Sequence, residues 1–123
     1  LGRSLVVEPY VDSVVLGARL LHATGAPAAL EAARKIVHDG AVCALAALED
    51  CSGGDVARIA TEAVSQGDGW VLRGSKAVVT SAPIADYLIV SAMLAFALFL
   101  AAISNSFTAS SRRPISLNAI PRS

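Results

Sequence analysis

Residues 66–76 read QGDGWVLRGSK, a short apolar run flanked by two glycine turns. The cluster Gly67-Asp68-Gly69 is typical of a hairpin turn, because Gly and Asp tolerate the positive φ values that such turns require. Trp70-Val71-Leu72 has strand composition, and Trp70 is expected to anchor a core. Before the turn, residues 59–65 alternate loosely between apolar and polar side chains. The stretch therefore predicts a strand, a tight turn and a second strand.

The pattern of strands and breaks continues on both sides of this hairpin. Arg73-Gly74 predicts a second turn that leads into a strand over residues 76–80. Residues 81–83, Ser-Ala-Pro, interrupt that strand, and residues 87–91 predict one more. Upstream, the apolar run over residues 41–48 predicts a buried strand.

The first forty residues instead carry the periodicity of helices. A first helix is predicted over residues 5–23, closed by Gly25. A second begins at Pro27, which suits a position where no N–H is needed, and ends at Gly40. The apolar positions that define the two helical stripes are Val11, Val14, Val15, Ala18, Leu21 and His22 in the first, and Leu30, Ala33, Ile36 and Val37 in the second.

Helices followed by an antiparallel run of strands predict an α+β fold, with a partial antiparallel β-domain after the helices. We expect a helical segment over residues 1–40, a β-segment over residues 41–92 and a divergent apolar, Ser-rich tail over residues 93–123.

Composition excludes several classes of protein. Ten basic and ten acidic residues give a net charge of zero, which offers no electrostatic argument for nucleic-acid binding. A hydrophobic content of 54% argues against disorder. Two cysteines rule out a disulfide framework or an all-Cys zinc site, and the two histidines lie on separate predicted helices with no metal-ligand pattern. No secretory signal pattern opens the chain, so a cytoplasmic location is expected.

An ordered series of motifs resembles the acyl-CoA dehydrogenase family, at the junction of its N-terminal helical domain and its middle β-domain. The resemblance covers about residues 1–92, and each motif alone would be weak. The motifs are Glu49-x-x-x-Gly53-x-Asp55, Thr61-x-Ala63, Gly67-Asp68-Gly69-Trp70-Val71-Leu72-x-Gly74-x-Lys76, Thr80, Ala85-Asp86 and Val90-x-Ala92.

The resemblance implies FAD as cofactor, an acyl-CoA thioester as substrate and a place in fatty acid metabolism. In the family, a carboxylate base removes the α proton while hydride passes from Cβ to flavin N5. That catalytic Glu lies in a C-terminal helical domain with no counterpart in this sequence, so we expect no catalytic residue here and no turnover by this chain alone. Full-length relatives form homo-oligomers.

Four positions match the family's binding residues. Thr80 corresponds to a Thr near flavin N5, and Val78 to an aromatic residue that borders the flavin. Leu48 stands where the family has a Thr on the flavin pyrimidine edge, so only its backbone could serve. These three are the expected cofactor-binding residues. Gly54 replaces a Ser that touches substrate or flavin and is the expected substrate-binding position.

Other polar residues of these motifs are expected to have ordinary roles. Glu49 and Asp55 are expected to be solvated loop carboxylates, and Lys76 to lie on a strand edge. The Ser52-Gly53-Gly54 loop is an ordinary turn unless its backbone N–H groups cradle a phosphate. Cys43 and Cys51 are expected to be small buried or loop thiols.

The tail leaves three interpretations open. Residues 115–121 resemble the family's next strand, which would make the preceding segment an insertion, and a frame slip in the coding sequence would also explain the change of composition. Residues 88–107 carry no charge and have the length of a transmembrane helix. The functional alternatives are accordingly a non-catalytic remnant or interaction partner, and a small membrane-anchored protein.

Overall fold

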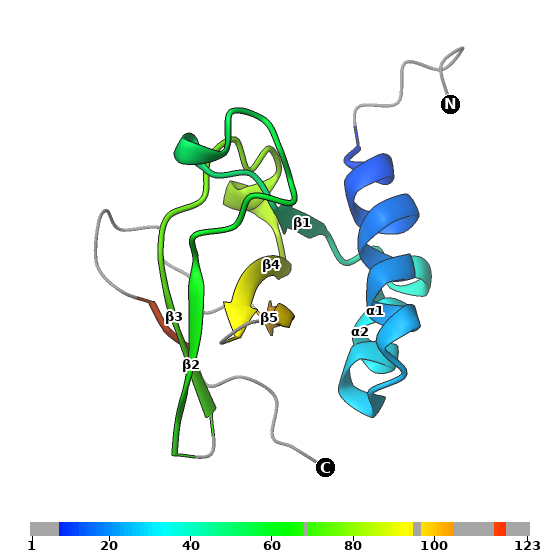
Figure 1. Ribbon diagram of the computed structural model, residues 1–123. Helices are drawn as coiled ribbons and strands as arrows, with labels where there is room; N and C mark the ends of the chain where they lie inside the picture. Colours follow the sequence, from blue (N-terminus) through cyan, green and yellow to red (C-terminus); the bar gives the residue numbers. More distant parts are fainter. Residues whose placement is uncertain (1–7, 68, 95–96, 105–114, 118–123) are drawn as a thin grey trace.

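The computed structural model describes residues 8–67, 69–94, 97–104 and 115–117 (Figure 1). A π-helix, η2 (Val11–Ala18), continues into α1 (Arg19–Thr24), and α2 (Pro27–His38) packs against both. Gly25 ends α1 in the left-handed region with φ 68°, and Pro27 occupies the first turn of α2. The predicted end of the first helix at Gly25 and start of the second at Pro27 are both confirmed, because each residue supplies the backbone geometry that its position requires.

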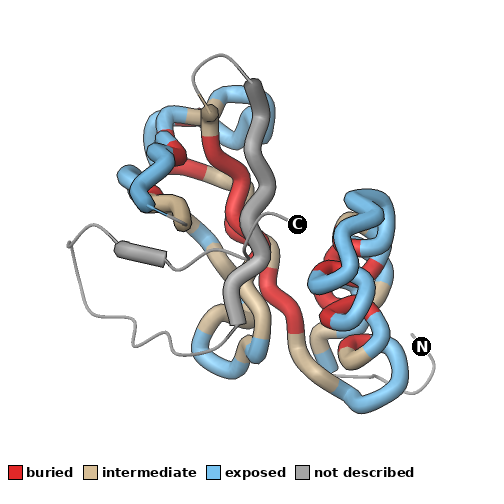
Figure 2. The backbone as a smooth tube through the Cα atoms, turned by 90° about the horizontal axis from the view of Figure 1, so that it is seen from below, coloured by how far each residue is buried: buried red, intermediate tan, exposed pale blue. Residues whose placement is uncertain are grey.

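The helices bury mostly small residues, together with Leu21 and Ile36 of the predicted stripes. Gly17, Ala18 and Leu21 are buried on the first helix, while Val11 and Val15 are exposed. On α2 the buried residues are Ala29, Ala32, Ala33 and Ile36, while Leu30 and Val37 stay exposed. His22, which the first stripe also included, is exposed as well, so the predicted stripes are wrong at five positions. Small side chains let the helices approach closely. Buried and exposed positions alternate along both helical segments (Figure 2).

A groove of about 940 Å³ lies between the exposed faces of the two helical segments. Apolar side chains form much of its wall, and basic or imidazole side chains complete it. The lining residues are Tyr10, Val14, Val15, Ala18, Arg19, His22, Ala23, Leu30, Ala33, Arg34, Val37 and His38.

The strands form one mixed sheet in the order β1-β4-β2-β3-β6, with β5 paired to β4 outside this path. Antiparallel pairs join β2 to β3, β3 to β6 and β4 to β5, whereas β1 and β2 each pair in parallel with β4. The α+β fold class is confirmed, and the parallel pairs are an addition to the antiparallel run that was predicted. The strand bounds are β1 (Cys43–Ala46), β2 (Glu62–Gln66), β3 (Gly69–Arg73), β4 (Tyr87–Leu94), β5 (Ala97–Ser104) and β6 (Ile115–Leu117).

The central hairpin is confirmed as β2 and β3, with Val64 opposite Val71 and Ser65 opposite Trp70. The strand predicted over residues 76–80 is wrong. The outer edge of β3 pairs with β6 instead, so that edge is not open to the segment that follows Gly74. That segment crosses to the end of β1, where the Ala77 N–H donates to the Leu48 carbonyl at 2.9 Å.

The uncharged stretch over residues 88–107 is not one helix. Its described part forms β4 and β5, paired from Tyr87–Ser104 to Leu94–Ala97. β4 has β1 on its other side, and a strand that is paired on both edges and covered on its faces has a continuous apolar sequence. In the portion of the chain that the structure describes, no helix has the length and hydropathy needed to cross a membrane. The strand expected over residues 115–121 is present as β6, and residues 118–121 lie outside the described residues.

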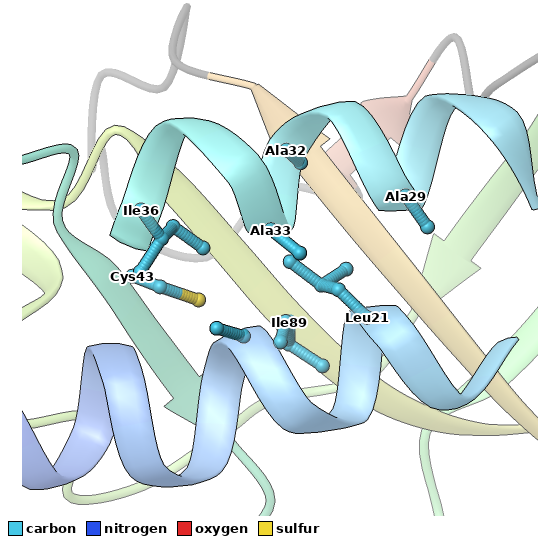
Figure 3. Packing of buried hydrophobic residues seen from close by; sticks show 8 residues of the cluster. Leu21, Ala29, Ala32, Ala33, Ile36, Cys43 and Ile89 are labelled. Atoms are coloured by element: carbon cyan, nitrogen blue, oxygen red, sulfur yellow. The ribbon is translucent and has the colours of Figure 1, made fainter. Parts of the chain in front are cut away.

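Two clusters of buried residues form the core. The first joins the helices to β1 and β4 through Leu21, Ile36, Cys43 and Ile89 (Figure 3). Its alanines are Ala18, Ala29, Ala32 and Ala33. The second lies within the sheet and contains Ala46, Ala63, Leu72, Val90 and Ala92, with the half-buried Trp70 packed against it.

The helices are attached to the sheet by polar contacts as well. The Ser13 hydroxyl donates to the Cys43 carbonyl and accepts from the Cys43 N–H, both at 2.9 Å. A Cβ on Gly17 would lie 2.8 Å from the Cys43 sulfur, so only glycine permits this approach. These contacts place η2 beside the start of β1.

Candidate functional site

A buried carboxylate, Glu49, organises the loops next to β1. One carboxylate oxygen accepts from the Thr61 N–H at 3.0 Å and from the Thr61 hydroxyl at 2.7 Å. The other accepts from the Ala60 N–H at 2.7 Å. Glu49 follows β1 in the chain, and its partners Ala60 and Thr61 lead into β2. It therefore joins two segments that lie eleven to twelve positions apart in the sequence.

Lys76 completes this arrangement, which we call the Glu49 cluster (Glu49, Thr61, Lys76 and Ser91). The Lys76 ammonium lies 2.7 Å from Glu49 Oε1, and the two side chains are only 10% and 3% exposed. It also donates to the Ser91 hydroxyl of β4 at 3.0 Å. The cluster therefore connects the loop after β1, the entry to β2, the segment after β3 and the middle of β4.

Burial alone would raise the pKa of Glu49, but the hydrogen bonds from Lys76, Thr61 and the Ala60 N–H outweigh it. They lower the pKa from 4.5 to about 2. A charged carboxylate with this many donors is stable only while they stay in place.

This pKa predicts acid sensitivity. Because the folded-state pKa is depressed, the stabilisation by Glu49 is present above about pH 5 and is lost as pH falls toward 2. The shift corresponds to about 3 kcal/mol of free energy of unfolding. Urea unfolding at pH 6, 4 and 3 checks it, with Glu49→Gln as the comparison. An equal loss of stability in wild type and variant over this range would contradict the prediction.

The expected solvated role of Glu49 and the strand-edge role of Lys76 are wrong. The two residues lie 27 positions apart, and no local pattern indicates that a loop carboxylate and a distant lysine will meet. Asp55, in contrast, is exposed and accepts from the Ala57 N–H, as a turn carboxylate does.

Three of the predicted binding positions, Leu48, Val78 and Thr80, lie on two neighbouring segments of the chain. Together with Ala77 they form what we call the Leu48–Thr80 surface (Leu48, Ala77, Val78 and Thr80). The bond from Ala77 to the Leu48 carbonyl joins the segments. Val78 is 78% exposed and has a φ of 52°, a conformation that β-branched residues rarely adopt. Such backbone outliers concentrate at sites that bind ligands.

Thr80 lies at the end of this surface, where the β-domain meets the helices. Its side chain is exposed, and its hydroxyl donates to the carboxylate of Asp12, in η2, at 2.8 Å. Asp12 carried no signal in the sequence, because a single polar residue in the first turn of a helix is usually solvated.

Gly54, the predicted substrate position, lies in an exposed turn after the short 3-10 helix η3 (Asp50–Ser52). Its φ is 90° and that of Gly53 is 62°, so both glycines supply conformations that other residues resist. The Ser52 hydroxyl is buried and donates to the Glu49 carbonyl, so this side chain shapes the loop and does not face outward.

The cysteines and histidines form no separate site among the residues described. Cys43 and Cys51 are both free thiols, and burial together with the charge of Asp12 raises the pKa of Cys43 to about 11. Over the described ranges, no group of His, Cys, Asp and Glu has the arrangement of a metal site.

Comparison with known proteins identifies the family to which this chain belongs. The model of the acyl-CoA dehydrogenase middle domain matches residues 44–116, more than half of the chain. A search of curated proteins finds no significant match.

Solved structures share the fold. The ChsE4-ChsE5 complex from Mycobacterium tuberculosis is 26% identical with a TM-score of 0.70, over 85% of this chain and 28% of that chain. A putative acyl-CoA dehydrogenase from Mycobacterium smegmatis is 19% identical with a TM-score of 0.74, over 91% and 35%. A glutaryl-CoA dehydrogenase from the same organism, in complex with FADH2, is 21% identical with a TM-score of 0.67, over 74% and 24%. The chain thus spans about a quarter to a third of the length of these relatives.

Proposed function

We propose, from the premise that this chain belongs to the acyl-CoA dehydrogenase family, that it is a piece of a FAD-dependent enzyme acting on acyl-CoA thioesters. In this proposal residues 1–40 end the helical domain, residues 41–92 begin the middle β-domain and residues 93–123 are a divergent tail, with the sheet continuing past residue 92 in β4 and β5. The observation that carries the proposal is the Leu48–Thr80 surface, in which Val78 and Thr80 are exposed and whose two segments are joined by the Glu49–Lys76 pair of the Glu49 cluster.

The residues of this surface fit one part of a flavin. Thr80 offers an exposed hydroxyl, Val78 an exposed apolar side chain, and Leu48 its backbone. A planar, partly polar ring system needs this combination of apolar contact and a few placed polar groups. FAD, when bound, would supply the hydride-accepting chemistry.

The chain's own contribution is therefore binding and orientation. The Glu49–Lys76 pair fixes the two segments on which Leu48 and Val78 lie, so that the surface is formed before a ligand arrives. We propose no catalytic residue within this chain. Gly54 keeps its proposed place toward the acyl-CoA, where an exposed turn without a side chain leaves room for substrate.

The proposal includes a cytoplasmic location for this chain. Two free thiols fit a reducing compartment, which supports a cytoplasmic chain.

The groove between the helices exposes apolar side chains such as Leu30 and Val37, and this favours a second candidate function, a non-catalytic remnant that associates with relatives or with its own copies.

The first experiment is a visible absorption spectrum of the 123-residue chain, purified without cofactor, before and after addition of FAD. A flavin band that stays with the folded protein through desalting supports the proposal. A folded protein that retains no flavin would leave the remnant function as the better description.

Thr80→Val is expected to weaken FAD binding about 3- to 10-fold, because it removes one hydroxyl group from the proposed contact and keeps the side-chain shape. Fluorescence titration with FAD measures the affinity. Ser65→Val is a suitable control, since Ser65 is an exposed residue of β2 with no role in the Leu48–Thr80 surface. Equal affinity of wild type and Thr80→Val would remove the side-chain assignment.

A further inference from the structure

We propose that strand β5 (Ala97–Ser104) is a self-association surface, which pairs antiparallel with β5 of a second copy of this chain. In the resulting dimer the sheet continues from one copy into the other. This proposal does not require FAD, and it assigns the association of like copies to a surface outside the groove between the helices.

Three strands, β1, β5 and β6, form the boundaries of the described sheet. In the part of the chain that the structure describes, β6 pairs with β3 alone, and β1 and β5 each pair with β4 alone, on its opposite edges (Figure 1). A strand with a single partner turns the N–H and C=O groups of every second residue away from that partner. These groups form a template on which another strand can pair.

Two of the three boundaries are protected against such pairing. The Ser13 hydroxyl of η2 donates to the Cys43 carbonyl and accepts from the Cys43 N–H, both at 2.9 Å, so a helix side chain occupies backbone groups of β1. β6 has only three residues, Ile115–Leu117. Covering an edge with a helix and keeping an edge strand very short are two ways in which proteins prevent edge-to-edge association.

β5 has neither protection among the residues described. It is eight residues long, and its register with β4 runs without a bulge from Tyr87–Ser104 to Leu94–Ala97. Its sequence, ALFLAAIS, contains no charge, no proline and no glycine. Low charge and the absence of proline and glycine mark segments that stack on identical segments.

Charge makes a second copy of β5 a suitable partner. No charged residue lies between Asp86 and Arg112, so two β5 strands approach each other without the like-charge repulsion that opposes the pairing of identical strands. The net charge of the whole chain is zero, which adds no long-range repulsion. Two antiparallel β5 strands related by a two-fold axis present the same edge to each other, so the contact closes at a dimer.

Sedimentation equilibrium of the 123-residue chain over a dilution series tests the proposal. We expect the wild-type chain to be a dimer. Ala101 lies near the middle of β5, and a two-fold axis brings the middles of the two strands together. Ala101→Lys therefore places two like charges close to each other and should raise the dissociation constant of the dimer at least about 10-fold. Ala101→Glu should have the same effect for the same reason.

Mixing these two variants separates a lost interface from a lost fold. Each variant alone should be largely monomeric, whereas an equimolar mixture should form dimers again, because Lys of one copy then meets Glu of the other. Unfolded variants would not be rescued in this way. Val37→Lys is the matched control, since it places the same charge on a 53% exposed residue of the groove, and it should leave the dimer intact.

A folded wild-type chain that stays monomeric throughout the dilution series overturns the proposal, and so does a polydisperse aggregate in place of a dimer. A mixture of the Lys and Glu variants that remains monomeric overturns it too. Dissociation by Val37→Lys and not by Ala101→Lys would place the interface in the groove instead. FAD is absent from all these measurements, so their failure leaves the proposed flavin function standing, and a chain that binds no FAD leaves the dimer to be judged by its mass alone.

Discussion

Lys76→Met is expected to lower the free energy of unfolding by about 3–5 kcal/mol, the usual effect of removing one partner from a buried ion pair. The Glu49 carboxylate would remain buried, with its strongest compensating charge gone. The Met side chain keeps the length of Lys but cannot donate to Glu49 or to Ser91. A small domain has about 5–15 kcal/mol of stability in total, so the variant should be close to unfolding at room temperature.

Urea titration followed by circular dichroism and by the fluorescence of the single tryptophan measures this loss. Arg58→Met is a matched control, because it removes a positive charge from an exposed loop residue. It should change stability by less than about 0.5 kcal/mol. The double variant Glu49→Gln with Lys76→Met should recover part of the loss, since no charge is then buried. A Lys76→Met protein as stable as the Arg58→Met protein would show that the pair does not hold the loops together.

Gly74→Ala should cost a similar amount, about 3–5 kcal/mol, for a steric reason. An added Cβ would collide with Thr61 Oγ1 and lie only 2.7 Å from Thr61 Cα, so the backbone of the neighbouring segment would have to move. Overpacking alone costs about 1–3 kcal/mol. The displaced Thr61 would also lose its bonds to the charged Glu49, and hydrogen bonds to charged groups contribute about 1.5–3 kcal/mol each.

Gly40→Ala is the control that isolates backbone strain. Gly40 has a φ of 74°, and an added Cβ meets no atom within 4 Å. Its expected cost is therefore only the left-handed conformation, about 1–2 kcal/mol. The same urea titration compares the two variants. Equal losses in both would mean that Gly74 is required for its φ alone and that the contact with Thr61 contributes nothing.

Local residue chemistry was sufficient to predict the helices and the hairpin whose ends are marked by Gly or Pro. Gly25 and Pro27 end and begin helices because each supplies a backbone geometry that other residues disfavour, whatever surrounds it. Gly67, with a φ of 60° at the end of β2, favours the β2–β3 hairpin for the same reason. The order of motifs was sufficient to indicate the family, which the match over residues 44–116 shows.

Contacts between distant segments decided the rest. Whether residues 76–80 form a strand depends on which edge of β3 is free, and β6 takes it. An uncharged stretch of twenty residues has the composition of a membrane helix and of a central strand pair alike, and only the pairing of β4 with β1 and β5 separates the two.

Residue types and the order of motifs were enough to predict the class of fold, the turns and the family, because these follow from local backbone preferences and from the order of short motifs. Tertiary structure alone decided which polar residues matter. Glu49 meets Lys76 across 27 residues, and Thr80 meets Asp12 across 68. The charge of a buried carboxylate and the polarity of a hydroxyl depend on the partner that folding brings within 3 Å, and no neighbour along the chain supplies that partner.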